Sequence, residues 1–316
     1  MIHYRTFQNS DPPKLVQIWQ ARAVERGLSQ SISVPVLEKL VFAKPYFDNR
    51  GLILAIDDET PVGFVHAGFG PTDDEQRISH MLGVTCMLMV RHDYRRQGIG
   101  RELITRSERY LRDLGAKVLY GGGIRPLNPF YLGLYGGSEL PGVLDSDQAA
   151  QQIYRACGYH EIDRTRIFQR DLADFRSPVD RQQMQIRRRM TLEVTQDPPT
   201  NTWWEACTLG GFERTRFELV EKSSRRTLAS AISWRIEPLG TSWGVHAAGL
   251  IDLEVQDGHR KQGLGTALLS EAMKHMRLSS FHRVEVQTMQ ANSVALRLYK
   301  KLGFQEVDGG AVLRKD

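Results

Sequence analysis

The chain has 316 residues, of which 41% are hydrophobic and 25% charged, and its net charge is +5 at pH 7. These proportions are typical of a soluble globular protein, and the length predicts about two domains of roughly 150 residues each. A membrane-spanning helix is excluded, because the chain has no run of about 18 apolar residues.

The N-terminal residues and the cysteines favour a cytoplasmic protein. Residues 1–5 read Met-Ile-His-Tyr-Arg and lack the apolar core of a signal peptide. Cys86, Cys157 and Cys207 are odd in number and scattered, which favours reduced thiols over a disulfide framework or a zinc site. We therefore expect no bound metal and no membrane association.

The positive charge of the chain is spread thinly along its length. Its sharpest cluster, Arg187-Arg188-Arg189, falls in a stretch that we interpret as the opening of a strand. A solvated sheet edge explains this cluster better than a track for phosphates. We therefore expect no nucleic-acid partner.

The first half of the chain predicts alternating strands and helices. Pro12-Pro13 marks a helix start, and Gly115 marks the end of a later helix. In chain order, the predicted elements are a strand at Ile2–Phe7, a helix at Lys14–Arg26, a hairpin of Leu52–Ile56 with Val62–Phe69, a strand at Val84–Val90, a helix through Leu103, Tyr110 and Leu114, a strand at Lys117–Tyr120, and a last helix around Tyr154.

A segment rich in glycine, proline and aromatic residues lies between the last strand and the last helix of this half. It runs from Gly121 to Gly142. It is too apolar for a disordered linker and too often interrupted for a helix, so it predicts an ordered loop.

The second half repeats the same order of elements after a polar linker at Asp171–Gln185. In chain order, we expect a strand at Gln185–Thr195, a helix at Thr202–Leu209, a hairpin of Phe217–Val220 with Leu228–Ile236, a strand at Leu250–Val255, a helix at Thr266–Arg277, a strand at Arg283–Thr288, and a helix at Asn292–Leu302.

A glycine-containing loop occurs between a strand and a helix in both halves. It reads Arg95-Arg96-Gln97-Gly98-Ile99-Gly100-Arg101 in the first half and Arg260-Lys261-Gln262-Gly263-Leu264-Gly265-Thr266 in the second. Such a turn directs free backbone N–H groups and the positive end of the helix dipole toward one point, where a phosphate can bind. Each half therefore offers a candidate phosphate site.

A second landmark repeats with the loop. The stretch 153–163 matches 298–308, and the tyrosine, glycine, glutamate and aspartate are identical at the same spacing. Tyr154 follows Gly98 by 56 positions, whereas Tyr299 follows Gly263 by 36. The halves are therefore two copies of one module, and the first copy carries an insertion of some 20 residues.

Both modules resemble the GNAT superfamily of N-acetyltransferases, which binds acetyl-CoA at an R/Q-x-x-G-x-G/A loop and places a tyrosine on a later helix near the sulfur of CoA. The tandem arrangement is similar to that of mycothiol synthase. The resemblance implies an α/β (α+β mixed) fold with two GNAT-like domains, each a twisted mixed sheet flanked by helices. We assign residues 1–175, with the inserted loop 121–145, to the first domain and residues 183–316 to the second.

The resemblance also implies which residues bind acetyl-CoA. The loops would hold the pyrophosphate, and a bulge in the strand before the loop would direct the N–H of Val255 at the thioester carbonyl. The expected cofactor-binding residues are Val90, Arg95, Arg96, Gln97, Gly98, Ile99, Gly100 and Arg101 in the first module and Leu253, Val255, Arg260, Lys261, Gln262, Gly263, Leu264, Gly265, Thr266 and Asn292 in the second.

Tyr299 is the expected proton donor to the departing thiolate, because a phenol is still protonated at neutral pH. A core tyrosine with its hydroxyl at the rim is the other reading. Asn292 either contacts the cofactor or caps the helix. Tyr154 is a weaker candidate than Tyr299, since Asp147 takes the place of Asn292 in the first module.

Two carboxylates are candidates for the base. Asp252 and Glu254 are two residues apart on one strand and could receive the ammonium proton directly or through water. The first module has Met87 and Met89 at these positions, which favours catalysis in the second module. The expected reaction is acetyl transfer from acetyl-CoA to a primary amine of a small molecule or protein. The alternative is a non-catalytic protein that binds acetyl-CoA.

The insertion has two readings of equal weight under this resemblance. It either hangs beside the acceptor cleft or packs on the other module. The residues do not specify the acceptor amine or the oligomeric state.

Overall fold

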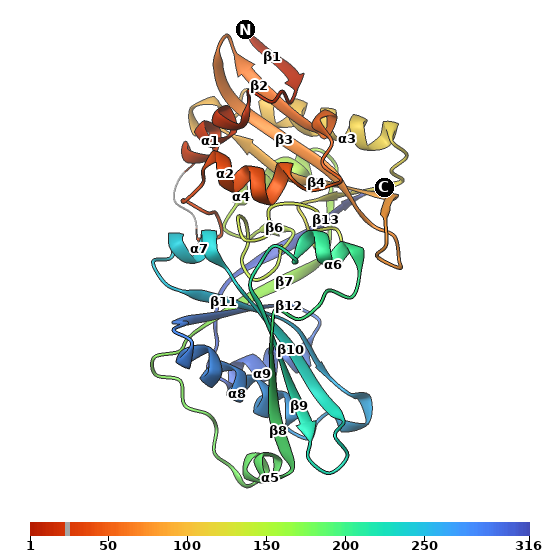
Figure 1. Cartoon of the computed structure of the whole chain (residues 1–316). Coiled ribbons are helices and arrows are strands. Elements are labelled where there is room, and N and C mark those ends of the chain that lie inside the picture. The colour runs from red at the N-terminus through yellow and green to blue at the C-terminus, as the bar shows by residue number, and fades with distance from the viewer. Residues whose placement is uncertain (23–25) are drawn as a thin grey trace.

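The computed structural model describes residues 1–22 and 26–316 and shows two modules stacked along an elongated molecule (Figure 1). Each combines a mixed sheet with flanking helices, as the sequence predicts. The first module contains β1 (Ile2–Thr6), α1 (Pro12–Gln20), α2 (Val34–Leu37), β2 (Leu52–Asp57), β3 (Thr60–Pro71), β4 (Ile78–Val90), α3 (Ile99–Asp113), β5 (Val118–Gly121), β6 (Val143–Leu144), α4 (Gln148–Ala156) and β7 (His160–Asp171).

The second module repeats this order closely. It contains α5 (Arg181–Arg189), β8 (Met190–Gln196), α6 (Trp203–Thr208), β9 (Arg214–Glu221), β10 (Thr227–Arg235), α7 (Glu237–Ser242), β11 (Ala247–Val255), α8 (Leu264–Leu278), β12 (Arg283–Met289), α9 (Ser293–Lys301) and β13 (Gln305–Lys315). The four-residue repeat of apolar positions on α8 is explained by burial, because Leu264, Leu268, Ala272 and Met276 all lie in the core.

Several of the predicted boundaries are wrong; the core strand expected from Val84, for example, begins at Ile78. The strand expected from Gln185 begins only at Met190, because Asp180 caps a preceding helix by accepting a hydrogen bond from Gln183 N at 2.8 Å. The arginine cluster 187–189 therefore lies in the last turn of α5, where cations face the negative end of the helix dipole. The first helix ends at Gln20 rather than Arg26, and residues 23–25 of its predicted range lie outside the described residues.

The modules exchange their last strands. Strand β7 follows the helices of the first module but pairs with β12 of the second, while β13 pairs with β5 of the first module. The two exchanged strands also pair with each other, so the described strands form one 13-stranded sheet. The division at residues 175 and 183 stays a prediction, and neither segment completes its own sheet without the last strand of the other.

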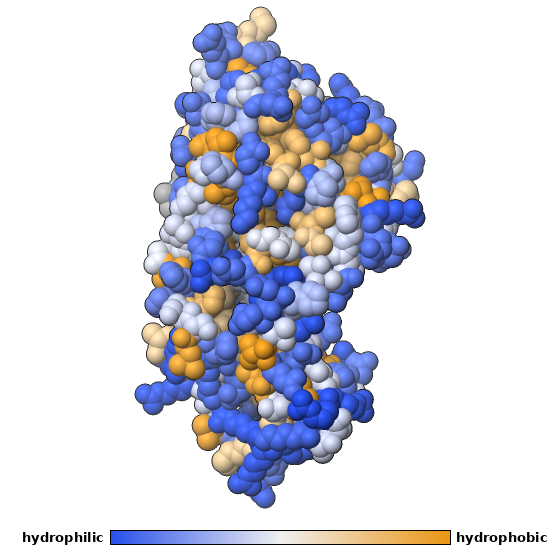
Figure 2. All heavy atoms as spheres, viewed as in Figure 1, coloured by the Kyte–Doolittle hydropathy of each residue, from blue (hydrophilic) through white to orange (hydrophobic). Residues whose placement is uncertain are grey.

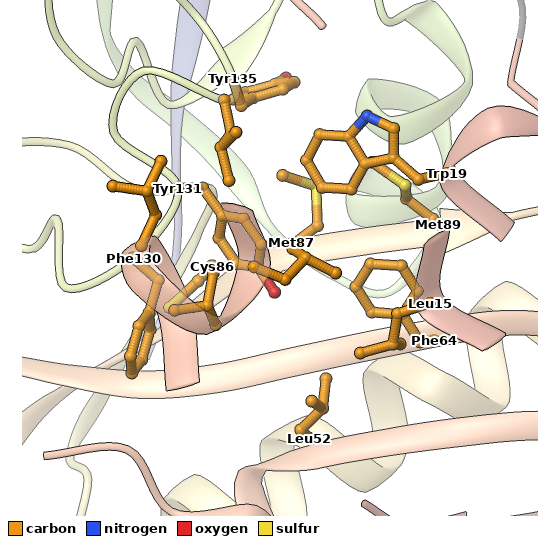
Figure 3. Close-up of a cluster of buried hydrophobic side chains, with 14 of the residues drawn as sticks. Leu15, Trp19, Leu52, Phe64, Cys86, Met87, Met89, Phe130, Tyr131 and Tyr135 are labelled. Carbon is orange, nitrogen blue, oxygen red and sulfur yellow. The ribbon is translucent and has the colours of Figure 1, made fainter. Parts of the chain in front are cut away.

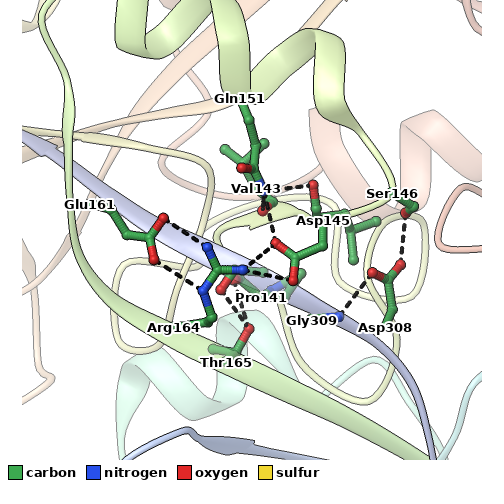
Figure 4. Close-up of polar contacts among 12 residues, drawn as sticks. Pro141, Val143, Asp145, Ser146, Gln151, Glu161, Arg164, Thr165, Asp308 and Gly309 are labelled. Atoms are coloured by element: carbon green, nitrogen blue, oxygen red, sulfur yellow. Dashed lines mark hydrogen bonds and ion pairs between the residues drawn. The ribbon is translucent and has the colours of Figure 1, made fainter.

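Arg164 fastens the end of the inserted segment to the exchanged strands (Figure 4). Its guanidinium on β7 donates two hydrogen bonds to Asp145, at 2.7 and 2.8 Å. The backbone N–H of Asp145 in turn donates to Gly309 O on β13 at 2.9 Å. The insertion is therefore an ordered part of the contact between the modules.

The inserted segment packs on the second module, as one of the two readings predicts. Leu132 joins a buried cluster with Ile232 and Trp234 of β10. The indole of Trp234 donates a hydrogen bond to Ser138 O at 3.1 Å. These contacts hold the segment beside β11 and β12, so it also borders the second module's site.

The visible surface is mostly hydrophilic, and its hydrophobic residues form small, separated patches (Figure 2). Among residues 1–22 and 26–316, no helix has the length and apolar character needed to cross a membrane. All three cysteines are free, and Cys86 is buried. The cytoplasmic location stays a prediction.

Candidate active site

The two glycine loops have the same geometry. Gly98 and Gly263 are the N-cap residues of α3 and α8, with φ of 84° and 82°. Positive φ strains a residue with a Cβ, so glycine is favoured at these two positions. A short 3-10 turn and the glycine loop connect each core strand to the helix that follows, and the first N–H groups of that helix have no partner within it.

The side chains of the two loops also match. Arg95 Nε donates to Val90 O at 3.5 Å, and Arg260 Nε donates to Val255 O at 3.2 Å. The residues that follow these arginines, Arg96 and Lys261, have φ of 61° and 60°. The loops are therefore structural copies, as the sequence repeat predicts.

An open cleft adjoins each loop. The cleft of the second module has a volume of about 930 Å³, and that of the first about 580 Å³. Of the expected cofactor residues, the second cleft is lined by Leu253, Val255, Arg260, Lys261, Gly263, Leu264, Gly265, Thr266 and Asn292, and the first by Val90, Arg95, Arg96, Gly98, Gly100 and Arg101. Gln97, Ile99 and Gln262 belong to the loops but not to these linings.

Basic side chains line both clefts, which suits a ligand rich in phosphate. Arg297 and Lys301 of α9 join the loop cations in the second cleft, and Arg22 does so in the first. The loop amides, the glycines and these cations fit the pyrophosphate of acetyl-CoA.

The sheet opens beside each loop. Strands β11 and β12 pair in parallel only from Ala247 with Arg283 to Leu250 with Val286. The first module repeats this, since β4 and β5 pair only as far as Thr85 with Gly121. Beyond these points no backbone pairing joins β11 to β12, or β4 to β5, among the described residues.

A bulge interrupts β11 at the edge of this gap. Ile232 pairs with Ile251 and Ser230 with Glu254, so β11 contains one extra residue there. Asp252 has φ of 52°, a rare conformation for a residue with a side chain. The expected bulge is present at 252–253, whereas Val255 keeps its pairing with Ala229. Leu253, inside the bulge, is therefore a second candidate donor to the thioester carbonyl.

Tyr299 lies on α9, and its ring is buried. The ring packs 5.9 Å from that of Phe168 on the exchanged strand β7 and is 5% exposed. None of the described residues forms a hydrogen bond with its hydroxyl group. The described residues include several polar atoms that are both buried and unpaired, but the Tyr299 hydroxyl is not one of them. It therefore still reaches solvent, while burial raises the pKa of Tyr299 and keeps the phenol protonated at neutral pH.

Tyr154 differs from Tyr299 although the two occupy matching positions. Its hydroxyl is buried and donates to Thr85 O at 3.4 Å. Burial raises the pKa of Tyr154 well above its ordinary value. A hydroxyl enclosed in this way has no access to a reacting group.

Asn292 and Asp147 both cap helices. Asn292 accepts a hydrogen bond from Ala295 N at 3.1 Å, and Asp147 accepts one from Ala150 N at 3.2 Å. Asp147 also pairs with Arg22 at 3.0 Å. Asn292 combines its capping role with a place in the cleft wall, so the two roles considered for it are compatible.

The candidate carboxylates have different surroundings. Asp252 forms an ion pair with Arg125 of the inserted segment. Glu254 is exposed and lines the cleft of the second module. Both belong to the stretch of β11 that borders the gap.

The matching region of the first module is filled by side chains. Met87 and Met89 are 5% and 1% exposed. They lie among Trp19, Tyr131 and the other apolar side chains drawn in Figure 3. The first module therefore has a glycine loop and a cleft, but the two positions of its core strand that match Asp252 and Glu254 are packed in the core.

Two residues of the insertion, Arg125 and Glu139, lie at the second module's site and escaped the sequence analysis. Arg125 Nη1 lies 3.9 Å from Glu139 Oε1 and also contacts Asp252. Burial raises the pKa of Glu139 to about 7, with Arg125 lowering and Asp252 raising it. The one feature of the sequence that could have indicated them is their charge, since the rest of the loop 121–142 carries none.

Glu139 makes stability depend on pH. Its folded pKa of about 7 exceeds the unfolded value of about 4.3. The contribution of Glu139 to the free energy of unfolding is therefore complete at pH values below its pKa in the unfolded chain. This contribution is lost as the pH rises through its pKa in the folded protein. Glu139→Gln should accordingly gain stability relative to the wild type as pH rises, by up to about 3 kcal/mol at pH 8. Urea unfolding at pH 5 and pH 8 measures this, and a difference that does not change with pH would contradict it.

The sequence profile described as "Acetyltransferase (GNAT) family" matches residues 17–136 and 184–304. The chain belongs to this family. The two matches fall on the two modules, so both copies are GNAT modules in sequence as well as in fold.

Known proteins with similar sequence or structure agree. An N-alpha-acetyltransferase of Sulfurisphaera tokodaii is 41% identical over 59 residues, which are 18% of this chain and 35% of that protein. A tandem GNAT protein from the clavulanic acid biosynthesis pathway has a TM-score of 0.66 at 14% identity, covering 100% of this chain and 98% of its own. The chain thus matches about a third of the length of the N-alpha-acetyltransferase. The similarity to the tandem GNAT protein shows the fold alone.

Two further solved structures share this tandem fold. A GCN5-related N-acetyltransferase from Sphaerobacter thermophilus has a TM-score of 0.65 at 14% identity, covering 99% of this chain and 95% of its own. A glucosamine N-acetyltransferase region of a fungal multi-domain GH3 beta-N-acetylglucosaminidase has a TM-score of 0.69 at 16% identity, covering 100% of this chain and 38% of that one.

Proposed function

We propose that the protein transfers an acetyl group from acetyl-CoA to a primary amine of a small molecule or protein, and that the second module performs the chemistry. The observation that carries this proposal is the difference between the two tyrosines. The Tyr299 hydroxyl has no partner among the described residues and reaches solvent, whereas that of Tyr154 is enclosed and bound to Thr85 O.

The residues of the second module meet the demands of the reaction in turn. The loop at Gly263 and its neighbouring cations hold the pyrophosphate. A backbone N–H at the bulge, of Leu253 or Val255, polarises the thioester carbonyl, and such a preorganised donor contributes about 2.7–4 kcal/mol to the transition state. The unprotonated acceptor nitrogen attacks the carbonyl carbon, the C–S bond breaks, and Tyr299 donates its proton to the thiolate. The acylated nitrogen then releases its extra proton, and a proton from solvent restores the phenol of Tyr299.

The first module retains acetyl-CoA binding in this proposal but not catalysis. Its loop matches that of the second module, while Met87 and Met89 replace the carboxylates and buried side chains fill the space beside them. A protein in which both modules only bind acetyl-CoA is the second candidate. The buried side chains beside Met87 and Met89 favour this binding-only role for the first module.

Acetyl-CoA is expected to bind the purified protein, because both clefts join helix N-terminal amides to basic side chains. Isothermal titration should give heat on addition of acetyl-CoA, and the melting temperature should rise. A short thioester such as S-acetyl-N-acetylcysteamine, which lacks the nucleotide and pyrophosphate, is the matched control and should bind far more weakly. Neither heat nor a thermal shift with acetyl-CoA would contradict the proposal.

A further inference from the structure

Three charged side chains meet where the inserted segment of the first module crosses the second. Arg125 Nη1 donates a hydrogen bond to Asp252 Oδ1, at the bulge of β11. The same nitrogen lies 3.9 Å from Glu139 Oε1. One guanidinium therefore links the carboxyl group of Glu139 to the edge of the gap between β11 and β12.

The backbone on both sides of Glu139 is fixed to β12. Ser138 N donates to Glu285 Oε1 at 2.7 Å, and Gln287 Nε2 donates to Leu140 O at 3.1 Å. Glu285 and Gln287 flank Val286, the last residue of β12 that pairs with β11. Glu139 is thus held at the point where the two strands separate. The backbone of its neighbours is hydrogen-bonded to β12, and its side chain is linked to β11 through Arg125.

The surroundings of Glu139 are acidic, and 24% of its side-chain surface stays exposed. Tyr299 of α9 and Asp252 of β11 lie within its electrostatic reach. Glu75 from the β3–β4 turn and Glu205 of α6 share a small pocket with Glu139 and Arg125, and Glu205 is paired with Arg214 at 2.9 Å. The pocket has a volume of about 20 Å³, enough for one water molecule.

The charges divide the second module's site into two sides. Arg260, Lys261 and Arg297 line the cleft on the loop side, where an anionic donor enters. Acidic residues outnumber Arg125 on the side of the inserted segment. A cationic amine is therefore favoured at the end of the gap that Glu139 occupies.

We propose that Glu139, contributed by the first module, accepts the proton of the acceptor's ammonium group in the second module, directly or through one water. This inference rests on the proposed acetyl transfer. The proton leaves nitrogen for the Glu139 carboxylate, the free amine attacks the thioester, and Glu139 returns the proton to solvent after the products leave. The inserted segment thereby completes an active site that the second module does not contain alone.

Glu139 suits this role better than the two carboxylates of β11. Asp252 is engaged by Arg125, so its part is to position the guanidinium beside Glu139. Glu254 lies in the open cleft on the cofactor side. Burial raises the pKa of Glu139 to about 7, and a base with a pKa near the working pH is the most effective.

The test is the pH profile of kcat/KM for acetyl transfer by the full-length protein, measured with acetyl-CoA and the best substrate from an amine panel. The wild-type rate should rise with pH through about 7, because Glu139 must be ionised to act. Glu139→Gln should lower kcat/KM by about 100-fold or more and remove this limb of the profile. Glu213→Gln is the matched control, since Glu213 is exposed and pairs with Arg235, and it should leave rate and profile unchanged.

Acetyl-CoA affinity and circular dichroism establish that Glu139→Gln is folded. A folded Glu139→Gln variant that keeps the wild-type rate and pH limb would overturn the role of Glu139 while leaving the acetyl transfer intact. A wild-type protein that transfers acetyl groups to none of the amines would overturn the proposed function, and with it the role of Glu139. The two failures are therefore distinguishable.

Discussion

Tyr299→Phe is expected to lower kcat by roughly 10²–10⁴-fold while leaving the Kd for acetyl-CoA nearly unchanged. The substitution removes the proton donor to the thiolate but keeps the ring that packs on Phe168 and Phe304. The hydroxyl makes no hydrogen bond to the described residues, so its loss should cost little stability. Single-turnover kinetics and isothermal titration separate the two effects.

Tyr154→Phe provides the matched control for this experiment. It removes the same atom from the corresponding helix of the first module, where the hydroxyl bonds to Thr85 O. It should cost about 1 kcal/mol of stability and leave kcat unchanged. If Tyr299→Phe kept its rate where chemistry is limiting, Tyr299 would be a core residue.

Gly263→Val is expected to lower kcat/KM for acetyl-CoA by roughly 100-fold or more, because losing one or two charge-assisted hydrogen bonds to the pyrophosphate costs about 1.5–3 kcal/mol each. Its φ of 82° strains any residue with a Cβ, and valine more than most. The new side chain would also meet the Gln182 side chain, 3.0 Å from the Cβ position. Steady-state kinetics and circular dichroism measure the loss and verify the fold.

Gly98→Val makes the same change in the first module, where φ is 84° and no atom lies within 4 Å of the Cβ position. It should abolish acetyl-CoA binding at the first loop and leave acetyl transfer largely intact. If Gly98→Val lost acetyl transfer while a folded Gly263→Val kept it, the assignment of catalysis to the second module would be reversed.

The sequence predicted the features that depend on local chemistry. The glycine loops at Gly98 and Gly263 predicted a turn from a strand into a helix, whereas the positive φ of these glycines and the bond from the preceding arginine to the strand are seen only in the structure. The glycine loop and the stretch that contains the tyrosine each occur once in both halves of the chain. The two modules, their core strands and their last helices could therefore be predicted. Capping of a helix was one of the two roles considered for Asn292, and the structure contains that hydrogen bond.

The strand exchange could not be predicted, because it depends on which of two similar strands completes each module. Strands β7 and β13 begin with His160-Glu161-Ile162-Asp163 and Gln305-Glu306-Val307-Asp308, which alternate in the same way. Hydrophobic alternation gives the faces of a strand but not its neighbour. The neighbours are chosen by contacts distant in sequence, such as that between β7 and β12.

Glu139 escaped the sequence analysis for a related reason. Its ion-pair partner Arg125 lies in the same segment, but the other groups within its electrostatic reach, Asp252 and Tyr299, lie on β11 and α9. Only the packing of the inserted segment on the other module brings them together. The sequence does not determine that packing, and the carboxylates that it indicates as candidate bases, Asp252 and Glu254, both lie on β11.

The location of the thioester in a crystal structure of the protein with acetyl-CoA tests the central claim most directly. We expect the acetyl group to enter the gap between β11 and β12, with its carbonyl oxygen on the N–H of Leu253 or Val255 and its sulfur within hydrogen-bonding reach of the Tyr299 hydroxyl. An acetyl group that reached Tyr154 between β4 and β5, with the gap of the second module left empty, would contradict the assignment of catalysis to the second module.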